Sequence, residues 1–305
     1  MKNTSGARGG AKRFYFSKKL VGYTMLFPFA ALFLVFVLLP VILSIFYSFF
    51  DYDMMKNFKF TGLDNYVKLF TTDDVFLISM KNTAVFSLIV GPIGFIMSFM
   101  FGWVVNNLKG SRAFALAFYA PSITGGVAVS TVWAYFFSSD RLGFINNFLL
   151  RAGMITTPVL WRNDPTKILF VIIVVSLWMS MGVGFLTNLA GLKNISGEIY
   201  EAAYVDGLSG RFKELYYITV PMMKPQLLFN AVMAIVNSMS VFDISANLVG
   251  YPSPEYSGHT LVAHLYDYAA IRLDLGYASG IAVVLFVIMF VFSRICTRMF
   301  SSKDE

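Results

Sequence analysis

The sequence predicts an all-α integral membrane protein with six transmembrane helices. Of its 305 residues, 57% are hydrophobic and only 13% are charged, whereas soluble domains carry about 25% charged residues. The deficit is concentrated in six long stretches without Asp, Glu, Lys or Arg, and each is long enough for the roughly 20 apolar residues of a membrane-crossing helix. The stretches are Leu20–Phe50, Asn82–Leu108, Ala113–Ser139, Ile168–Leu192, Pro225–Phe242, which resumes after Asp243 as far as Pro254, and Leu275–Ser293.

Other classes of structure fit these stretches poorly. Strands of a membrane barrel are about 10 residues long and alternate polar with apolar residues. Buried helices of soluble bundles rarely run beyond about 20 residues without a charge. The first stretch is about twice the length of the apolar region of a signal peptide, and no Ala-x-Ala cleavage site closes it. We therefore expect it to be retained as the first span.

The distribution of Lys and Arg predicts the orientation, because basic residues concentrate on the cytoplasmic side of a membrane. The N-terminal tail Met1–Lys19 has six Lys or Arg residues and no acid. We predict a basic cytoplasmic tail at residues 1–20, a six-span domain at residues 21–300 and a cytoplasmic C-terminal tail at residues 301–305. The net charge of +7 is explained by anionic membrane lipid, so no nucleic acid partner is expected.

Cysteine and histidine usage gives no sign of a metal site. Cys296 is the single cysteine, which excludes a disulfide within the chain. His259 and His264 are the two histidines, and we expect both to be polar residues of an external loop. We predict no metal and no cofactor bound by this chain.

Glycine and proline residues mark two irregular spans. Gly91-Pro92-x-Gly94 is expected to break the second span, and Pro121 with Gly125-Gly126 to break the third. Broken membrane helices often line a transport path. The alternative is that these residues permit ordinary kinks and close helix packing.

The most informative predicted cytoplasmic segment is residues 191–225, between the fourth and fifth spans. Ser196 is placed to cap a helix whose first turns hold Glu198 and Glu201, because acids are favoured near the positive helix end. Gly207 is expected to end this helix. A second helical piece is expected from about Ser209 to Thr219, before Pro221 and Pro225. Such an exposed helix–break–helix suits docking into a groove of a cytosolic partner, and an interfacial loop is the alternative.

This segment carries a longer motif. It reads Glu201-Ala202-Ala203-Tyr204-Val205-Asp206-Gly207 and, after ten intervening residues, Ile218-Thr219-Val220-Pro221. It resembles the EAA loop of the permease subunits of binding-protein-dependent ABC importers, and we call residues 191–225 the EAA-like loop. Asn65-Tyr66 and Ser240-Val241-Phe242-Asp243 are similar to the carbohydrate-uptake, maltose-permease-like branch. The sequence departs from that branch after the fifth span, where Val249-Gly250-Tyr251-Pro252 replaces the usual Thr-Gly-Gly-Gly-Pro.

The resemblance implies a type I ABC permease fold in a bacterial plasma (inner) membrane, and a transport subunit that is not itself an enzyme. Its partners would be a second permease subunit, two cytosolic ABC ATPase subunits and an extracytoplasmic binding protein that delivers a carbohydrate. The chain has no Gly-x4-Gly-Lys-Ser/Thr motif, so ATP and Mg would be bound by the ATPase partners. The residues expected to couple to those partners are Glu201, Ala202, Ala203, Asp206 and Gly207.

A solute path is expected along the fifth span. On a continuous helix, Asn237, Ser240, Asp243 and Asn247 share one face about 120° wide. Their amide, hydroxyl and carboxylate groups suit the hydroxyls of a sugar, although the same stripe could instead pack against another helix. A non-sugar solute such as glycerol phosphate or a polyamine, a membrane-embedded enzyme, and a receptor or channel are the other functional hypotheses.

Overall fold

The computed structural model describes residues 18–54, 58–124 and 126–300, and within them the chain is mainly helical. The α-helices are α1 (Lys18–Phe33), α2 (Leu39–Tyr47), α3 (Asp64–Thr71), α4 (Asp74–Asn106), α5 (Ser111–Ile123), α6 (Gly126–Phe136), α7 (Phe144–Arg151), α8 (Pro165–Met179), α9 (Val183–Lys193), α10 (Gly197–Val205), α11 (Arg211–Glu214), α12 (Val220–Met222), α13 (Lys224–Met239), α14 (Asp243–Val249), α15 (Leu261–Tyr266) and α16 (Leu275–Phe300). The shorter helical turns are η1 (Leu34–Leu38), η2 (Leu215–Thr219), η3 (Pro254–Tyr256) and η4 (Asp267–Ile271). One antiparallel hairpin pairs β1 (Phe50–Asp51) with β2 (Lys59–Phe60). Most residues of the two terminal tails expected from the sequence, 1–17 and 301–305, lie outside the described residues.

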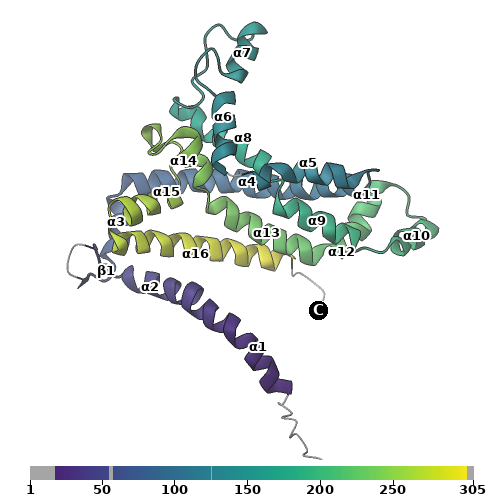
Figure 1. Cartoon of the computed structure of the whole chain (residues 1–305), viewed down its shortest axis with the longest axis horizontal. Coiled ribbons are helices and arrows are strands. Elements are labelled where there is room, and N and C mark those ends of the chain that lie inside the picture. Colours follow the sequence, from purple (N-terminus) through teal and green to yellow (C-terminus); the bar gives the residue numbers. More distant parts are fainter. Residues whose placement is uncertain (1–17, 55–57, 125, 301–305) are drawn as a thin grey trace, which may run out of the picture.

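The long helices α4, α13 and α16 run side by side and form the body of the molecule (Figure 1). Helix α9 packs against α4 and α13, and α2 packs against α16. The helix α10 lies at one end of this body, and α3 and β1 lie at the opposite end (Figure 1). We call these the α10 end and the α3 end.

The membrane-spanning character predicted from the sequence is confirmed by the lengths of the helices. Within the described residues, four helices are long and apolar enough to cross a membrane, namely Gly22–Tyr47, Asp74–Asn106, Pro165–Lys193 and Leu275–Met299. Two further pairs pass the same test but are bent, by 93° between α5 and α6 and by 80° between Arg211–Met222 and α13. The count of six therefore holds only if each bent pair is one span.

Several helices begin at residues whose side chains cap them. Asp73 accepts a hydrogen bond from the Phe76 N–H at 2.9 Å at the start of α4. Asp164 accepts one from the Thr166 N–H at 3.0 Å, with Pro165 in the first turn of α8. These interactions satisfy N–H groups that have no partner within the helix, and proline is tolerated at this position because it lacks an N–H.

The expected break of the second span at Gly91 to Gly94 is wrong. Helix α4 continues through Pro92 as one helix of 33 residues. The two glycines serve close packing instead: an added Cβ would lie 3.3 Å from Ser238 Oγ at Gly91 and 3.0 Å from Ser180 at Gly94. The missing side chains allow α13 and the junction of α8 and α9 to approach α4, as small residues do in membrane bundles.

The break expected in the third span is found. Helix α5 includes Pro121 and ends at Ile123, and α6 begins at Gly126. Gly125, the other glycine of this motif, lies outside the described residues.

The fifth span is not the continuous helix assumed from the sequence. Helix α13 ends at Met239, Phe242 has non-helical φ and ψ angles of −139° and −59°, and α14 begins at Asp243. The Thr260 hydroxyl donates to the Val241 carbonyl at 2.7 Å, which satisfies a backbone group that the break sets free. Asp243 is the first residue of α14, where a carboxylate is favoured by the helix dipole.

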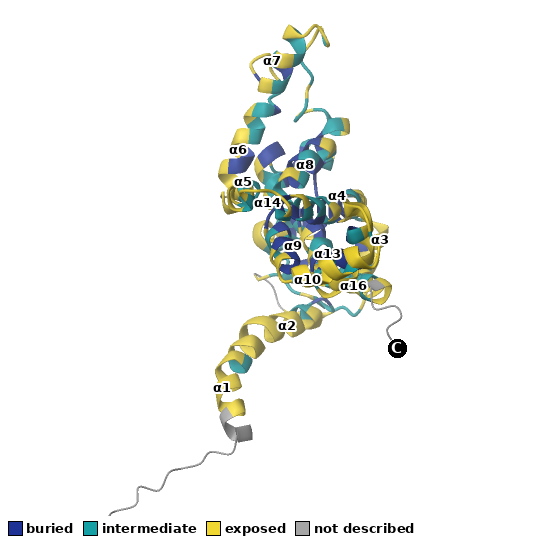
Figure 2. Cartoon of the chain, turned by 90° about the vertical axis from the view of Figure 1, so that its right-hand side faces the viewer, coloured by how far each residue is buried: buried dark blue, intermediate teal, exposed yellow. Residues whose placement is uncertain are grey.

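The first span, made of α1, η1 and α2, extends away from the body, and its side chains are largely exposed in the isolated chain (Figure 2). The C-terminal end of this span is attached to the body by hydrogen bonds from α3. Asn65 donates from Nδ2 to the carbonyls of Ser48 at 3.0 Å and Phe50 at 2.9 Å, and the Tyr66 hydroxyl donates to Ser48 Oγ at 2.7 Å. The Asn65-Tyr66 pair noted in the sequence therefore attaches α3 to the end of α2.

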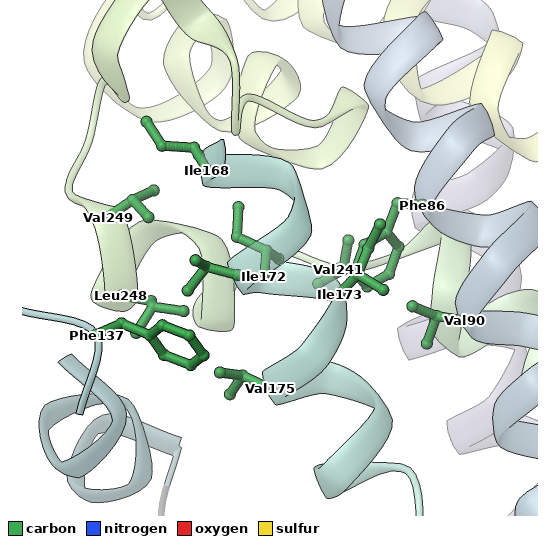
Figure 3. Packing of buried hydrophobic residues seen from close by; sticks show 11 residues of the cluster. Phe86, Val90, Phe137, Ile168, Ile172, Ile173, Val175, Val241, Leu248 and Val249 are labelled. Carbon is green, nitrogen blue, oxygen red and sulfur yellow. The ribbon is translucent and has the colours of Figure 1, made fainter. Parts of the chain in front are cut away.

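The largest apolar cluster surrounds α8. Ile168, Ile172 and Val175 project from this helix toward Phe137, Leu248 and Val249, and Phe86 and Val90 of α4 lie on its other side (Figure 3). This packing joins α8 to α14 and to the end of α6. It fixes one wall of the cavity described below.

Candidate coupling loop and solute path

Helix α10 is bounded as the sequence predicted. The Ser196 hydroxyl accepts a hydrogen bond from the Glu198 N–H at 3.3 Å. At the other end, the Leu208 N–H bonds the Ala203 carbonyl at 2.9 Å and the Gly207 N–H bonds the Tyr204 carbonyl at 3.1 Å. This pattern is a Schellman motif, which requires a left-handed residue at the position after the C-cap. Gly207 supplies it, with φ of +89°.

Two tyrosines of α10 attach it to the second arm of the EAA-like loop. The Tyr204 hydroxyl donates to Glu214 of α11, and this contact raises the pKa of the tyrosine. The Tyr200 and Thr219 hydroxyls share a hydrogen bond of 3.0 Å. The second arm, predicted from Ser209, runs from Arg211 through η2 to Met222. These contacts make α10 and the second arm one connected unit.

The residues predicted to couple lie on the outside of this unit. Glu201, Ala202, Asp206 and Gly207 are exposed, and Ala203 is half-buried. Nearby apolar side chains are also uncovered, with Val205 88% and Phe212 78% exposed. An exposed short helix with a carboxylate, small residues and apolar tips has the composition of a docking surface.

The EAA-like loop is fixed to the body by buried apolar residues. Leu215, Ile218 and Met223 are buried, and Leu215 and Met223 share a cluster with Leu192 of α9. At Gly191 an added Cβ would lie 2.9 Å from the Met223 side chain. The two helices that enter and leave the loop are therefore in close contact where they meet it.

A cavity of about 490 Å³ lies between α4, α8, α9 and α13, and we call it the central cavity. Its polar lining includes Ser176, Ser180, Asn230 and Asn237. Ser176 is 5% exposed, and its hydroxyl has no hydrogen-bond partner among the described residues. The hydroxyl oxygen itself is buried, so a solute in the cavity does not contact it in this arrangement of the wall.

The structure does not join the four residues predicted for the solute path into one stripe, because the helix breaks between them. Asn237 lines the central cavity. Ser240 follows α13, with its hydroxyl 3.8 Å from Met289 Sδ of α16. Asp243 and Asn247 belong to α14. All four are exposed in the isolated chain.

Sequence reasoning missed a buried polar network beside the cavity. Asn230 of α13 donates to Asn188 of α9 at 2.8 Å, and Asn188 reaches Ser98 of α4 at 3.4 Å. All three are at least 95% buried, and Asn230 and Ser98 also line the central cavity. The signal was present in the sequence, because each residue is polar within an otherwise apolar stretch.

The expectation that both histidines are loop residues is confirmed for His259, which lies between η3 and α15, and is wrong for His264. His259 and His264 are 3% and 1% exposed, and His264 lies within α15. Its Nε2 lies 3.0 Å from Asp73 Oδ2, which also accepts a hydrogen bond from the Tyr277 hydroxyl at 2.7 Å. Burial lowers the pKa of both histidines, that of His259 to about 4. The described residues contain no group of three or more side chains that could hold a metal ion.

The matches to known proteins agree with this geometry. Residues 90–301 match the family described as "Binding-protein-dependent transport system inner membrane component". The chain belongs to this family. The matched part of the permease begins in α4 and includes the central cavity helices, the EAA-like loop and α16.

Relatives of this permease match along almost the whole chain. It is 35% identical over 295 residues to the probable ABC transporter permease protein YesP of Bacillus subtilis, covering 94% of each chain. It is 32% identical over 293 residues to the lactose transport system permease protein LacF of Rhizobium radiobacter, covering 94% of this chain and 95% of the relative. The resemblance to sugar permeases of ABC transporters is thus confirmed.

A solved structure shows the same fold. It is described as a bacterial ABC transporter involved in the import of the acidic polysaccharide alginate. The TM-score is 0.79 at 22% sequence identity, over 93% of this chain and 96% of the matched one. The permease fold predicted from the sequence is confirmed at this level.

Proposed function

We propose that this chain is a transmembrane permease subunit of an ATP-driven importer, and that it moves a sugar or oligosaccharide delivered by an extracytoplasmic binding protein. The observation that carries the proposal is the exposed helix α10, closed by a Schellman motif at Gly207 and attached to two helices that border the central cavity. A transporter that binds no ATP itself needs such a surface to receive work from a partner.

The packing of the helices would allow a displacement of α10 to be transmitted to the central cavity. Helix α9 leads into the loop and α13 leaves it, and the two are packed together at Gly191 and Met223. A displacement of α10 would move these helices as a unit, because packed elements shift between discrete arrangements rather than deform continuously. Since both helices line the central cavity, the same movement would open or close it.

The partners in this proposal are a second permease subunit, two cytosolic ABC ATPases that bind ATP and Mg, and the binding protein. Glu201 and Asp206 offer carboxylates to a basic groove of an ATPase, and the small side chains of Ala202 and Ala203 permit close approach. Gly207 sets the turn that presents them. Membrane lipid surrounds the spans, and the exposed apolar surface of α1 and α2 is available to lipid or to the second permease.

Both termini and the α10 end are proposed to face the cytoplasm of a bacterial cell. The α10 end carries basic residues such as Lys109, in the short connection between α4 and α5, and Arg112, in the first turn of α5, as expected for an inner face. Reporter fusions at residue 205 should read inside, and fusions at residues 60 and 260 should read outside. A fusion at 205 that reads outside would overturn this orientation.

The sugar assignment rests on the relatives, of which LacF is named for lactose transport, and on the uncharged polar lining of the central cavity. The test is uptake by vesicles that contain the purified complex, with labelled lactose and other oligosaccharides as probes. We expect uptake that requires both ATP and the binding protein. Uptake that persists without ATP would refute the importer, and ATP-driven uptake of glycerol phosphate or a polyamine alone would favour the alternative solute class.

A further inference from the structure

The polar part of the central cavity lining is uncharged among the described residues. Its polar groups are hydroxyls and amides, and no Asp, Glu, Lys, Arg or His is found among the described residues that line it. The hydroxyls and amides belong to Ser98, Ser122, Ser176, Ser180, Asn230 and Asn237, with Ser238 beside them. Each of these groups can both donate and accept hydrogen bonds, as sugar hydroxyls do.

The depth of several of these groups makes the absence of charge significant. Ser176, Asn230 and Ser98 are at least 95% buried. In such a place an unpaired carboxylate, sulfonate or phosphate of a solute would lose its hydration without gaining a cation, which is strongly unfavourable. A neutral hydroxyl loses far less hydration free energy, and the hydroxyls and amides of the lining can hydrogen-bond to it.

The ionisable residue nearest in sequence to this lining is Asp243, whose negative charge does not favour an anionic solute. Asp243 lies between Phe242 and Ile244, and Ile244 and Val241 line the central cavity. The negative charge of the Asp243 carboxylate, one residue from the lining, repels acidic solutes that approach it. It is also insufficient for a polyamine, because a solute with several positive charges needs several acids and the described lining supplies none.

We propose that the wall of the solute path supplied by this chain selects uncharged, hydroxyl-rich solutes and excludes acidic sugars. This inference rests on the proposed function. It separates this chain from the structural neighbour, whose description names an acidic polysaccharide, and it makes an oligosaccharide without carboxylate, sulfate or phosphate groups the expected cargo.

The charge selectivity of the cavity can be tested without knowing the cargo. Cys296 is replaced by Ala, and one cysteine is then placed in the cavity by Ser180→Cys or, at its exposed edge, Asn237→Cys. The purified nucleotide-free complex is treated with three thiol reagents: an uncharged methyl methanethiosulfonate, an anionic sulfonatoethyl analogue and a cationic trimethylammonium analogue. Met154→Cys is the matched control, because Met154 is 70% exposed in a loop away from the cavity.

Rates are expressed relative to those at the control position, which removes the intrinsic reactivity of each reagent. We expect the uncharged reagent to react at Ser180→Cys, and both charged reagents to react at least tenfold more slowly by this measure. Equal relative rates for all three would overturn the proposal. If no reagent reacts at either position, the cavity is closed to solutes and the proposal also fails, while ATP-driven uptake by the same preparation shows whether the proposed function stands.

Discussion

Asn230 Nδ2 donates a hydrogen bond to Asn188 Oδ1 at 2.8 Å, and this bond joins the helices at the two ends of the EAA-like loop. Both residues are at least 95% buried. Hydrogen bonds between membrane helices contribute about 0.6 kcal/mol on average and up to about 1.7 kcal/mol. The Asn230–Asn188 hydrogen bond is therefore a modest stabilising contact at the point where the EAA-like loop meets the cavity wall.

We expect Asn230→Ala to lower the free energy of unfolding by roughly 1 kcal/mol and to reduce the stimulation of ATP hydrolysis by solute. The reason is that α9 and α13 lose one of the contacts that hold them together, beside the packing at Gly191 and Met223. Thermal unfolding and ATPase assays of the purified complex measure the two effects. Ser98→Ala is the control, since its contact with Asn188 is longer, at 3.4 Å, and an equal loss of stimulation in that variant would contradict a special role for the pair.

Gly207 is predicted to be intolerant of side chains for a backbone reason alone. No atom lies within 4 Å of an added Cβ, but its φ of +89° costs an L-residue about 1 kcal/mol or more. Gly207→Val should leave the protein inserted and abolish solute-stimulated ATP hydrolysis, and Glu201→Lys should do so by reversing a docking charge.

Gly197→Val provides the matched control for Gly207→Val. It stands at the first position of the same helix, also with open space around an added Cβ and without a positive φ. We expect this variant to retain stimulated ATP hydrolysis. Normal transport by both Gly207→Val and Glu201→Lys would remove Glu201–Gly207 from the coupling role.

Asp243 is predicted to serve the solute path rather than to hold the fold together. It is exposed in the isolated chain at the start of α14, and a carboxylate facing lipid would cost roughly 2.5 kcal/mol or more near the bilayer centre. Asp243→Ala should impair uptake into vesicles while the ATPase still co-purifies. Loss of assembly together with uptake would indicate a packing role, and unchanged uptake would exclude Asp243 from the path.

The buried histidines predict a dependence of stability on pH. Burial lowers the pKa of His259 from 6.5 to about 4, so the unfolded chain takes up this proton first as the pH falls. The stability that the neutral ring contributes is complete above about pH 6.5 and is lost as the pH falls toward 4, by on the order of 3 kcal/mol. The pKa of His264 is lowered in the same direction by burial, with Asp73 opposing it.

This dependence can be measured as the unfolding temperature of the purified chain at pH 7 and at pH 5. We expect a clear decrease at pH 5, and a smaller decrease in His259→Gln, which cannot be protonated. An equal decrease in the two proteins would show that other groups carry the pH dependence.

The regular parts of the molecule could be predicted from local sequence. Uncharged stretches located the spans because lipid admits few charges, and Ser196 with Gly207 bounded α10 because caps act within a few residues. The EAA-like motif could be recognised in the sequence because its residues lie in one continuous segment.

The rest depended on contacts between segments that are far apart in the sequence. The break after Met239 is stabilised by Thr260, and nothing within residues 225–254 indicates that partner. Likewise, the residues that pack on Gly91 and Gly94 of α4 come from distant helices. The buried His264 contacts Asp73, which lies 191 positions away. The central cavity is lined by residues of several helices, so the polar pattern along the fifth span alone indicates only Asn237.

The central claim is that α10 is the surface through which an ATPase drives this permease. The most direct measurement is cross-linking of the assembled complex from a photoreactive residue placed at Val205, which is 88% exposed, with the same residue at Met154 as control. We predict a cross-link to the ATPase from position 205 and none from position 154. No ATPase adduct from position 205 in an active complex would contradict the account.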